Sequence, residues 1–237
     1  MPRLSLTLLG SAVLLSCGFA IIASAADLPP PAYPPPPVVY TPALPPFSWN
    51  GFYIGGNAGY GWTSASGTVT TTTGSGPFSA SGSGFLGGAQ AGVNWQMGPA
   101  VFGMEADFQA TSGNGPITAT AGPTITGTAK MPYFGTFRGR LGYAFDRFML
   151  YGTAGGVYGE NTMNGTVSTA GSFSSSSTFL SWTAGGGVEV AFWGCWSAKL
   201  EYLYIGSPNR LPPIPTVTAV SDSSSTNIVR AGLNYHF

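Results

Sequence analysis

The sequence is poor in charge. Only 7% of its 237 residues are Asp, Glu, Lys or Arg, and eight basic residues balance eight acidic ones. A water-exposed protein surface usually carries about 25–35% of these residue types. We therefore expect something other than water to solvate much of the chain. The balanced charge also lacks the basic excess that is typical of nucleic-acid-binding proteins, so nucleic acid is not an expected partner.

Histidine and cysteine are also scarce. His236 is the single histidine, and Cys17 and Cys195 are the two cysteines. A general base near neutral pH is usually histidine, and zinc sites need several His or Cys ligands. The nearest resemblance to a phosphate-binding loop, residues 185–190, lacks the glycine spacing and a following helix. We therefore expect that the protein is not an enzyme and has no metal site and no cofactor. His236 is expected to be a residue of the periplasmic rim of the fold.

The N-terminal residues have the pattern of a signal peptide. Arg3 precedes an apolar run over residues 4–22, and Ala23-Ser24-Ala25 supplies the small-residue motif before a cleavage site. We predict a signal peptide over residues 1–25, cleaved between Ala25 and Ala26. A membrane anchor or a lipid on Cys17 is less favoured, because apolar residues continue past Cys17 to this site. If Cys17 leaves with the signal, Cys195 has no partner for an intrachain disulfide.

Proline dominates the next segment, residues 26–46. Proline has no amide donor and fixes one backbone angle, so this segment is predicted to be an extended periplasmic linker without a core. The domain that follows is expected over residues 47–237.

That domain shows no helical period. Instead, alternate residues differ in polarity, as in Val229, Ala231 and Leu233 against Arg230 and Asn234. Successive strand side chains point to opposite faces, so this period indicates strands with one apolar face. For residues 147–159 the pattern does not decide which side chains face outward, because apolar residues occur in both sets of alternate positions. Eight strands are predicted, over residues 51–62, 85–96, 100–110, 133–145, 147–159, 178–192, 196–205 and 226–237.

The connections between these strands alternate in length. Tight turns are expected at residues 97–99, 146–147 and 193–195, and long loops rich in Ser, Thr, Gly or Pro at residues 63–82, 111–131, 160–177 and 207–225. Short turns at one end, long loops at the other and an even strand count are typical of bacterial outer-membrane barrels. We therefore predict an all-β fold, an eight-stranded antiparallel up-and-down transmembrane β-barrel, with both ends of the domain on the periplasmic side.

Aromatic residues on the apolar phase gather at the two ends of the predicted strands. Rings with an apolar body and a polar tip favour the depth of the lipid headgroups, so two aromatic belts are expected. The short-turn belt comprises Phe52, Trp95, Phe102, Tyr143, Phe145, Phe192, Trp196, Tyr235 and Phe237, and the other belt Tyr60, Trp62, Phe108, Tyr133, Trp182 and Tyr204.

Three segments carry a resemblance to a known family. They are Gly51-Phe52-Tyr53-Ile54-Gly55-Gly56-Asn57-Ala58-Gly59-Tyr60-Gly61-Trp62, Lys199-Leu200-Glu201-Tyr202-Leu203-Tyr204 and Val229-Arg230-Ala231-Gly232-Leu233-Asn234-Tyr235-His236-Phe237. Together with the proline-rich start, they resemble the small outer-membrane proteins of alphaproteobacteria, often labelled porin-family or opacity-type. These proteins fall within the wider group of eight-stranded barrels that includes the OmpA membrane domain.

This resemblance implies a location in the outer membrane of a Gram-negative cell. Outer-membrane lipid and lipopolysaccharide are the implied partners, and the barrel-assembly machinery is the implied partner during biogenesis. Tyr235 and Phe237 match the assembly signal that this machinery reads, although His236 between them departs from the family pattern. The oligomeric state stays open.

The strand phases place eight of the sixteen charged residues in the lumen. The expected lumen charges are Glu105, Asp107, Glu189 and Glu201 with Arg138, Arg140, Lys199 and Arg230. From their heights above the short turns, we predict the pairs Glu105–Arg140, Asp107–Arg138, Glu189–Lys199 and Glu201–Arg230.

Three classes of function are compatible with a barrel. The interior of an eight-stranded barrel is only about wide enough for its own side chains. Paired charges would therefore fill the lumen of a structural protein that stabilises the envelope and displays surface loops. A passive channel for small solutes is the alternative. A secreted lipocalin-like binder is disfavoured, because it needs an apolar interior and a charged exterior.

Overall fold

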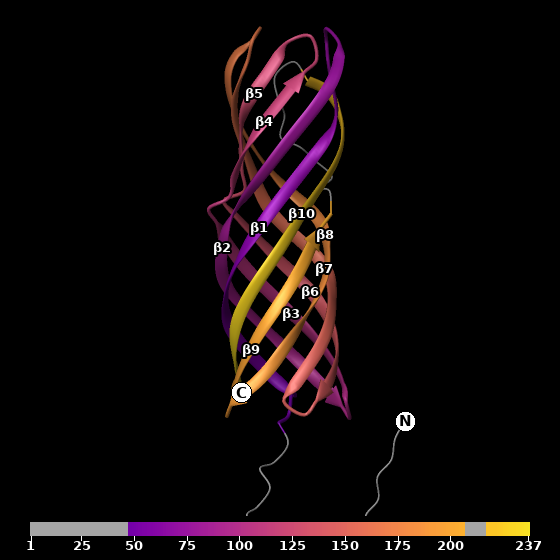
Figure 1. Cartoon of the computed structure of the whole chain (residues 1–237), viewed down its shortest axis with the longest axis vertical. Coiled ribbons are helices and arrows are strands. Elements are labelled where there is room, and N and C mark those ends of the chain that lie inside the picture. Colours follow the sequence, from indigo (N-terminus) through magenta and orange to yellow (C-terminus); the bar gives the residue numbers. More distant parts are fainter. Residues whose placement is uncertain (1–46, 207–216) are drawn as a thin grey trace, which may run out of the picture. The chain divides into compact units, whose positions relative to one another are not determined.

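A computed structural model describes residues 47–206 and 217–237 (Figure 1). The predicted signal peptide, its cleavage site at Ala25 and Ala26, and the whole of the predicted linker lie outside these residues. The described residues form one compact unit. Within the described part of this unit, no helix is long and apolar enough to cross a membrane.

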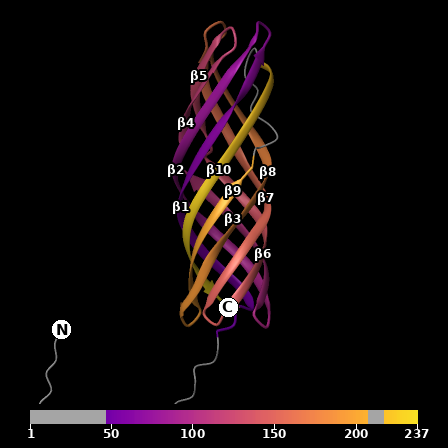
Figure 2. The same ribbon diagram turned by 45° about the vertical axis from the view of Figure 1, so that its right-hand side comes forward.

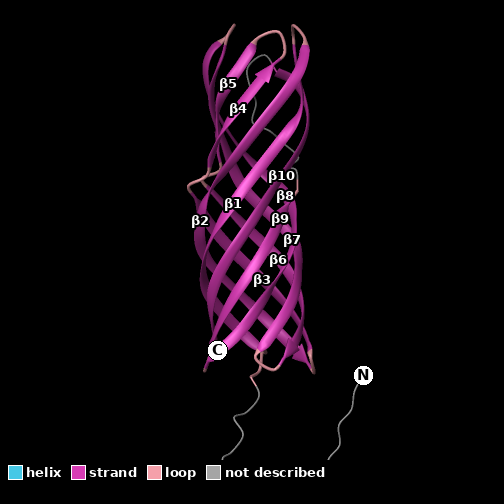
Figure 3. Ribbon diagram, viewed as in Figure 1, coloured by secondary structure: helices cyan, strands magenta, loops and turns pink. Residues whose placement is uncertain are grey.

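The described residues form ten strands, all paired in antiparallel fashion (Figure 3). The strands are β1 (Gly51–Thr71), β2 (Ser75–Met97), β3 (Ala100–Thr111), β4 (Asn114–Thr120), β5 (Thr124–Lys130), β6 (Tyr133–Phe145), β7 (Phe148–Val167), β8 (Gly171–Trp193), β9 (Trp196–Ile205) and β10 (Val217–His236).

Eight of these strands close a barrel. The hydrogen-bonded ring runs β1, β2, β3, β6, β7, β8, β9 and β10, and β10 returns to β1 over a register that begins at Tyr53 opposite His236. Figures 1 and 2 show the tilted strands of this ring from two directions. The predicted eight-stranded up-and-down barrel is thereby confirmed.

Strands β4 and β5 form a hairpin that extends the wall beyond β3 and β6. Strand β4 pairs with β2 at Ala119 opposite Phe78, and β5 pairs with β7 at Ile125 opposite Val167. Figure 1 shows the hairpin at the end of the barrel away from the C-terminus. The wall is therefore longer than predicted.

The prediction of long loops is wrong for most of these residues. Strands β1 and β2 meet at a turn over residues 72–74, and β7 and β8 at a turn over residues 168–170. Residues 111–131 are mostly β4 and β5. Their Ser, Thr and Gly content suggested loops, but threonine is β-branched and suits a strand. Residues 207–216 of the fourth predicted loop lie outside the described residues.

The short turns at the other end are confirmed. Gly98, Asp146 and Gly194 each have positive φ, at 61°, 55° and 51°. Two-residue hairpin turns need such angles, which glycine adopts without strain. We refer to this end as the short-turn end and to the end with turns 72–74, 121–123 and 168–170 as the far end.

The outer surface changes along the strands. The predicted belt residues are exposed or half-buried, and in β7 Phe148, Leu150 and Tyr158 face outward, which settles the open facing of that strand. Strands β1, β2, β7, β8 and β10 are 20–23 residues long. About 9–11 residues cross the apolar layer of a membrane. After Trp62, the outward residues of β1 are Ser64, Ser66, Thr68 and Thr70, so the far half of the barrel has a polar exterior.

The interior is layered along the barrel. At the short-turn end, Trp49 packs with Val101 and Met149. The polar and charged side chains come next. A cluster that we call the inner apolar layer follows, and the outer apolar cluster lines the far end. The inner layer comprises Leu86, Phe134, Val157, Phe179, Leu203, Ile205 and Ile228, and the outer cluster Val69, Phe78, Ile117, Ala119, Ala121, Ile125, Met163 and Val167.

Candidate functional site: the charged cluster inside the barrel

All eight predicted lumen charges lie inside the barrel. They come from β3, β6, β8, β9 and β10, where each occupies an inward position of the alternating strand pattern. None is more than 7% exposed, and Arg138, Glu189 and Arg230 have no exposed surface. Four acids thus face four bases in a space shielded from solvent. Charges this deeply buried need partners, because their transfer from water costs several kcal/mol each.

Glu105 is the centre of the cluster. Lys199 Nζ donates to both of its carboxylate oxygens, at 2.9 and 2.8 Å, and Arg138 forms a short ion pair with it. Arg230 and Arg140 lie further away, at 3.5 and 3.6 Å. One carboxylate on β3 therefore holds bases from β6, β9 and β10 across the lumen.

Arg138 and Arg230 link two further acids. Arg138 donates to Asp107 and to Glu201, both at 2.9 Å. Arg230 donates to the same two carboxylates, at 2.8 Å and 2.7 Å. Each acid thus lies between two guanidinium groups, whose planar forks suit such sharing. This arrangement ties β3 to β6, β9 and β10.

Arg140 and Glu189 form a second group nearer the short-turn end. Arg140 donates to Glu189 at 2.7 Å and to the Tyr53 hydroxyl at 2.7 Å, and its guanidinium lies 4.0 Å from the centre of the Tyr151 ring. Tyr53 in turn donates to Glu105 at 2.8 Å. The tyrosine therefore connects the two groups of charges.

Three of the four predicted ion pairs are confirmed, and the pair Glu189–Lys199 needs correction. Opposite Glu105 on the neighbouring strand stands Arg138, and opposite Asp107 stands Thr136, so the predicted heights were wrong by two residues. The two pairs form all the same, with Arg138 2.9 Å from Asp107 and Arg140 3.6 Å from Glu105. Lys199 does stand opposite Glu189, but it bonds to Glu105 across the lumen. The pair Arg230–Glu201 is confirmed at 2.7 Å. The stagger of tilted strands shifts the heights, and a long side chain can cross the narrow lumen.

Sequence reasoning missed the neutral polar residues that complete the cluster. Thr136 donates to Asp107 at 2.8 Å, and Asn234 donates to Glu189 at 2.7 Å. The Tyr151 hydroxyl donates to Glu201 at 3.2 Å. Asn234 was placed on the inward phase, but its bond to Glu189 was not predicted. Thr136 shares that phase, so a closer reading of phase would have found it. Tyr151 lies in the strand whose facing was left open.

His236 is covered by the aromatic residues that precede β1. Its ring centre lies 5.6 Å from that of Phe47 and 5.7 Å from that of Trp49, and it is 5% exposed. Trp49 is fully buried, and its indole N–H donates to the Asp146 carbonyl at 3.0 Å. His236 therefore lies at the short-turn end, where a residue of the rim was expected, and is covered by a cap formed by Phe47 and Trp49.

The contact of His236 with Ser197 resembles part of a hydrolytic site. Ser197 Oγ lies 2.9 Å from His236 Nε2, but it also lies 2.5 Å from Glu189 Oε1, to which it donates. Ser197 has no exposed surface. A nucleophile needs contact with substrate, and this hydroxyl is enclosed. Within the described residues, no three His, Cys, Asp or Glu side chains are grouped as metal ligands.

The predicted assembly residues lie on the outer surface. Tyr235 and Phe237 are 37% and 72% exposed, and their rings are 5.3 Å apart. The Phe237 amide donates to the Phe52 carbonyl at 2.9 Å, which continues the pairing of β10 with β1. Both rings thus stand at the seam that closes the barrel.

Comparison with known families agrees with this geometry. Residues 38–237 match the family described as outer membrane protein beta-barrel domain. The chain belongs to this family. The match covers every strand of the barrel, together with the capping residues Phe47 and Trp49.

Relatives of this family occur in alphaproteobacteria, as predicted. The chain is 38% identical over 212 residues to the 31 kDa outer-membrane immunogenic protein of Brucella melitensis, covering 81% of this chain and 85% of the relative. It is 30% identical over 234 residues to the 25 kDa outer-membrane immunogenic protein of Brucella abortus, covering 98% of each. The 22 kDa outer membrane protein of Rhizobium leguminosarum is 32% identical over 163 residues, with coverage of 69% and 66%.

These matches place the protein in the cell outer membrane. The short turns of such barrels lie on the periplasmic side and the other ends of the strands face the cell exterior. The cap of Phe47 and Trp49 is then at the periplasmic end, and the polar far half of the barrel is at the end that faces the cell exterior.

Proposed function

We propose that the protein is a structural barrel of the outer membrane with a closed lumen. The observation that carries this proposal is the buried charged cluster, in which Glu105 on β3 bonds to Lys199 on β9 and to Arg138 on β6. An ion that crossed the lumen would have to separate these buried pairs. Such separation costs roughly 3–5 kcal/mol for each partner lost.

Two further layers support a closed lumen. Trp49 covers the periplasmic end and has no exposed surface, and the inner apolar layer lies beyond the charges. Leu203, Phe134 and Ile228 in that layer are at most 1% exposed. An apolar constriction repels ions because dehydration is costly. Removal of one layer would therefore leave two in place.

The far half of the barrel supports a role at the cell surface. Its strands run beyond the apolar band, and their outward residues, such as Ser66 and Thr68, are polar. We propose that this half lies among lipopolysaccharide and presents its hairpin turns to the medium, in place of the long loops expected from sequence. Two relatives carry the word immunogenic in their names. Surface hairpins of this kind would be accessible to antibodies.

The barrel-assembly machinery is a proposed partner during biogenesis. The adjacent outward rings of Tyr235 and Phe237 at the seam between β10 and β1 support this proposal. Substitution of both rings by alanine should lower the amount of heat-modifiable barrel in the outer-membrane fraction. A normal yield of the double variant would contradict a role for these rings in assembly.

Recording in planar lipid bilayers tests the closed lumen. The purified wild-type barrel should give no steady unitary conductance over a range of voltages. Trp49→Ala should also stay silent, because the charged cluster and the inner apolar layer remain. A larger outer-membrane porin in the same bilayer serves as the positive control.

The alternative function, a passive channel for small solutes, predicts the opposite result. A steady unitary conductance of the wild-type protein, changed in size or ion selectivity by Arg138→Met, would refute the closed lumen and establish the channel. The envelope role has a separate test. A strain without the protein should become more sensitive to detergent, and plasmid-borne wild-type protein should restore its resistance.

A further inference from the structure

The far half of the lumen contains a cavity of about 170 Å³. Its lining includes Leu86, Phe179 and Ile228 from the inner apolar layer, and Phe78 and Ile117 from the outer apolar cluster. The cavity therefore lies between two separate apolar clusters. Strand register places the cavity beyond the charged cluster. Gln90 of β2 is opposite Asp107, and Leu86 lies four residues nearer the far end than Gln90.

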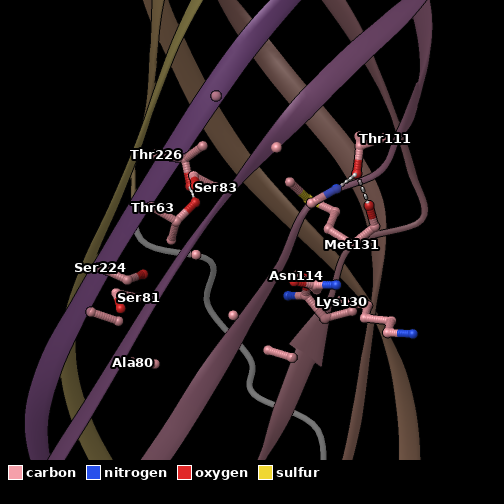
Figure 4. Close-up of a pocket in the computed structure, with 18 of the residues that line it drawn as sticks. Thr63, Ala80, Ser81, Ser83, Thr111, Asn114, Lys130, Met131, Ser224 and Thr226 are labelled. Carbon is pink, nitrogen blue, oxygen red and sulfur yellow. Dashed lines mark hydrogen bonds between the residues drawn. The ribbon is translucent and has the colours of Figure 1, made fainter.

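Four hydroxyl groups at the wall bond to the protein itself, and most of the remaining wall is apolar. Thr63 and Thr226 share a hydrogen bond of 2.7 Å, and Thr111 donates to the Met131 carbonyl (Figure 4). Ser83 accepts a hydrogen bond from Tyr60 at 2.8 Å. Lys130 is exposed, and its side chain is directed away from Thr63 and Thr226 (Figure 4). These hydroxyls are already engaged, so the wall favours an apolar occupant.

The volume defines the size of that occupant. An apolar protein cavity of about 150 Å³ lined by Leu, Ile and Phe takes up benzene. This cavity is slightly larger, and its lining includes the same residue types. We propose that it is a binding site for one small apolar molecule, of the size of a single aromatic ring.

This site differs from a passage through the lumen. The charged cluster lies between the cavity and the periplasmic end, and Leu203 and Phe134 of the inner apolar layer are at most 1% exposed. An occupant would therefore be retained at the outer side of the barrel. The site would capture an apolar molecule at the cell surface without transporting it across the membrane.

Methyl NMR with fluorobenzene as the probe tests this proposal. Fluorobenzene is titrated into the isotope-labelled barrel in lipid nanodiscs, and the leucine and isoleucine methyl signals are followed. The methyls of Leu86, Ile117 and Ile228 should shift in a saturable way. Those of Leu141 and Leu200 face the lipid, with exposures of 59% and 54%, and report partition of the probe into the bilayer.

Matched variants locate the site. Ala80 faces inward and lines the cavity, whereas Ala154 faces outward on β7. Ala80→Leu should fill the cavity and weaken binding at least tenfold, and Ala154→Leu should leave it unchanged. If Ala80→Leu does not fold, Ala129→Leu on β5 makes the same test, because Ala129 also lines the cavity.

Two results would overturn the proposal. In the first, the interior methyls do not shift, or they shift linearly together with those of Leu141 and Leu200, which indicates partition into lipid alone. In the second, the folded Ala80→Leu and Ala129→Leu barrels both bind fluorobenzene as tightly as the wild type. The bilayer recording is independent of both results, so failure of this site would leave the closed lumen standing.

Discussion

The substitution Arg138→Met removes the most highly connected base of the charged cluster. Arg138 has no exposed surface and forms ion pairs with Glu105, Asp107 and Glu201. Methionine has a similar length and no charge, so the change tests charge with little loss of volume. Four buried acids would then face three bases. We expect this imbalance to destabilise the barrel.

The structure indicates the size of the loss. Loss of one partner from a buried ion pair costs roughly 3–5 kcal/mol when the remaining charge stays dry, and less when water reaches it. The side chains of Glu105 and Glu201 have no exposed surface, so the dry value applies. We therefore expect the free energy of unfolding of Arg138→Met to fall by roughly 3–5 kcal/mol.

Urea unfolding in lipid vesicles, followed by tryptophan fluorescence, measures this change. Lys130→Met is the matched control, because Lys130 is exposed. Exposed charges typically contribute less than about 1 kcal/mol. The control should therefore unfold at nearly the wild-type urea concentration.

A double variant separates charge imbalance from damage to packing. Arg138→Met with Glu105→Gln restores equal numbers of acids and bases. The decrease in its free energy of unfolding should be smaller than the sum of the decreases in the two single variants. The difference should be about 0.5–3 kcal/mol, as for contacting residues in one network. Additive losses, or an Arg138→Met loss no larger than that of Lys130→Met, would refute the cluster as a source of stability.

Two other predictions test the outer wall and the far half of the barrel. Leu233 is 52% exposed on the lipid face. Leu233→Arg should therefore lower the free energy of unfolding in vesicles by up to about 2–4 kcal/mol, the cost of arginine at the bilayer midplane. Ser66 lies beyond the apolar band, so Ser66→Arg should change this free energy little. Equal losses in the urea assay would mean that Ser66 also faces lipid. Amide hydrogen exchange should show slow exchange at Val69 and Phe78, which lie in paired strands, and fast exchange at Thr72 in the turn between them. Fast exchange at all three would support the long loop expected from the sequence.

The sequence by itself determined which way most strand residues face. Successive side chains of a strand point to opposite faces, so the direction of each side chain follows from the local sequence. Glu105 and Arg138 were therefore placed inside, and Phe102 and Leu141 outside, without knowledge of the neighbouring strands. The turns around Gly98 and Gly194 were also predictable, because few residues tolerate positive φ. Closure into an eight-stranded barrel followed from the even number of such strands.

The strands of the far half of the barrel were not predicted, because their amino-acid composition resembles that of loops. Val69 and Ile117 alternate with Thr and Ser in segments that resemble polar loops. In the structure these residues point inward and form the outer apolar cluster. The alternation was present in the sequence, but a single apolar residue among Ser and Thr gives a weak signal. The tertiary structure makes these segments strands, because β4 pairs with β2 and β5 pairs with β7.

Three of the four predicted ion pairs form, but the further contacts that join the lumen charges into one cluster were decided by the tertiary structure. Lys199 on β9 bonds to Glu105 on β3, although Glu189 stands opposite it on the next strand. Which charges meet depends on the tilt and stagger of strands that are not neighbours, and no local pattern encodes these quantities. The cap over His236 has the same cause. Trp49 reaches it only because the closed ring brings the start of β1 beside the end of β10.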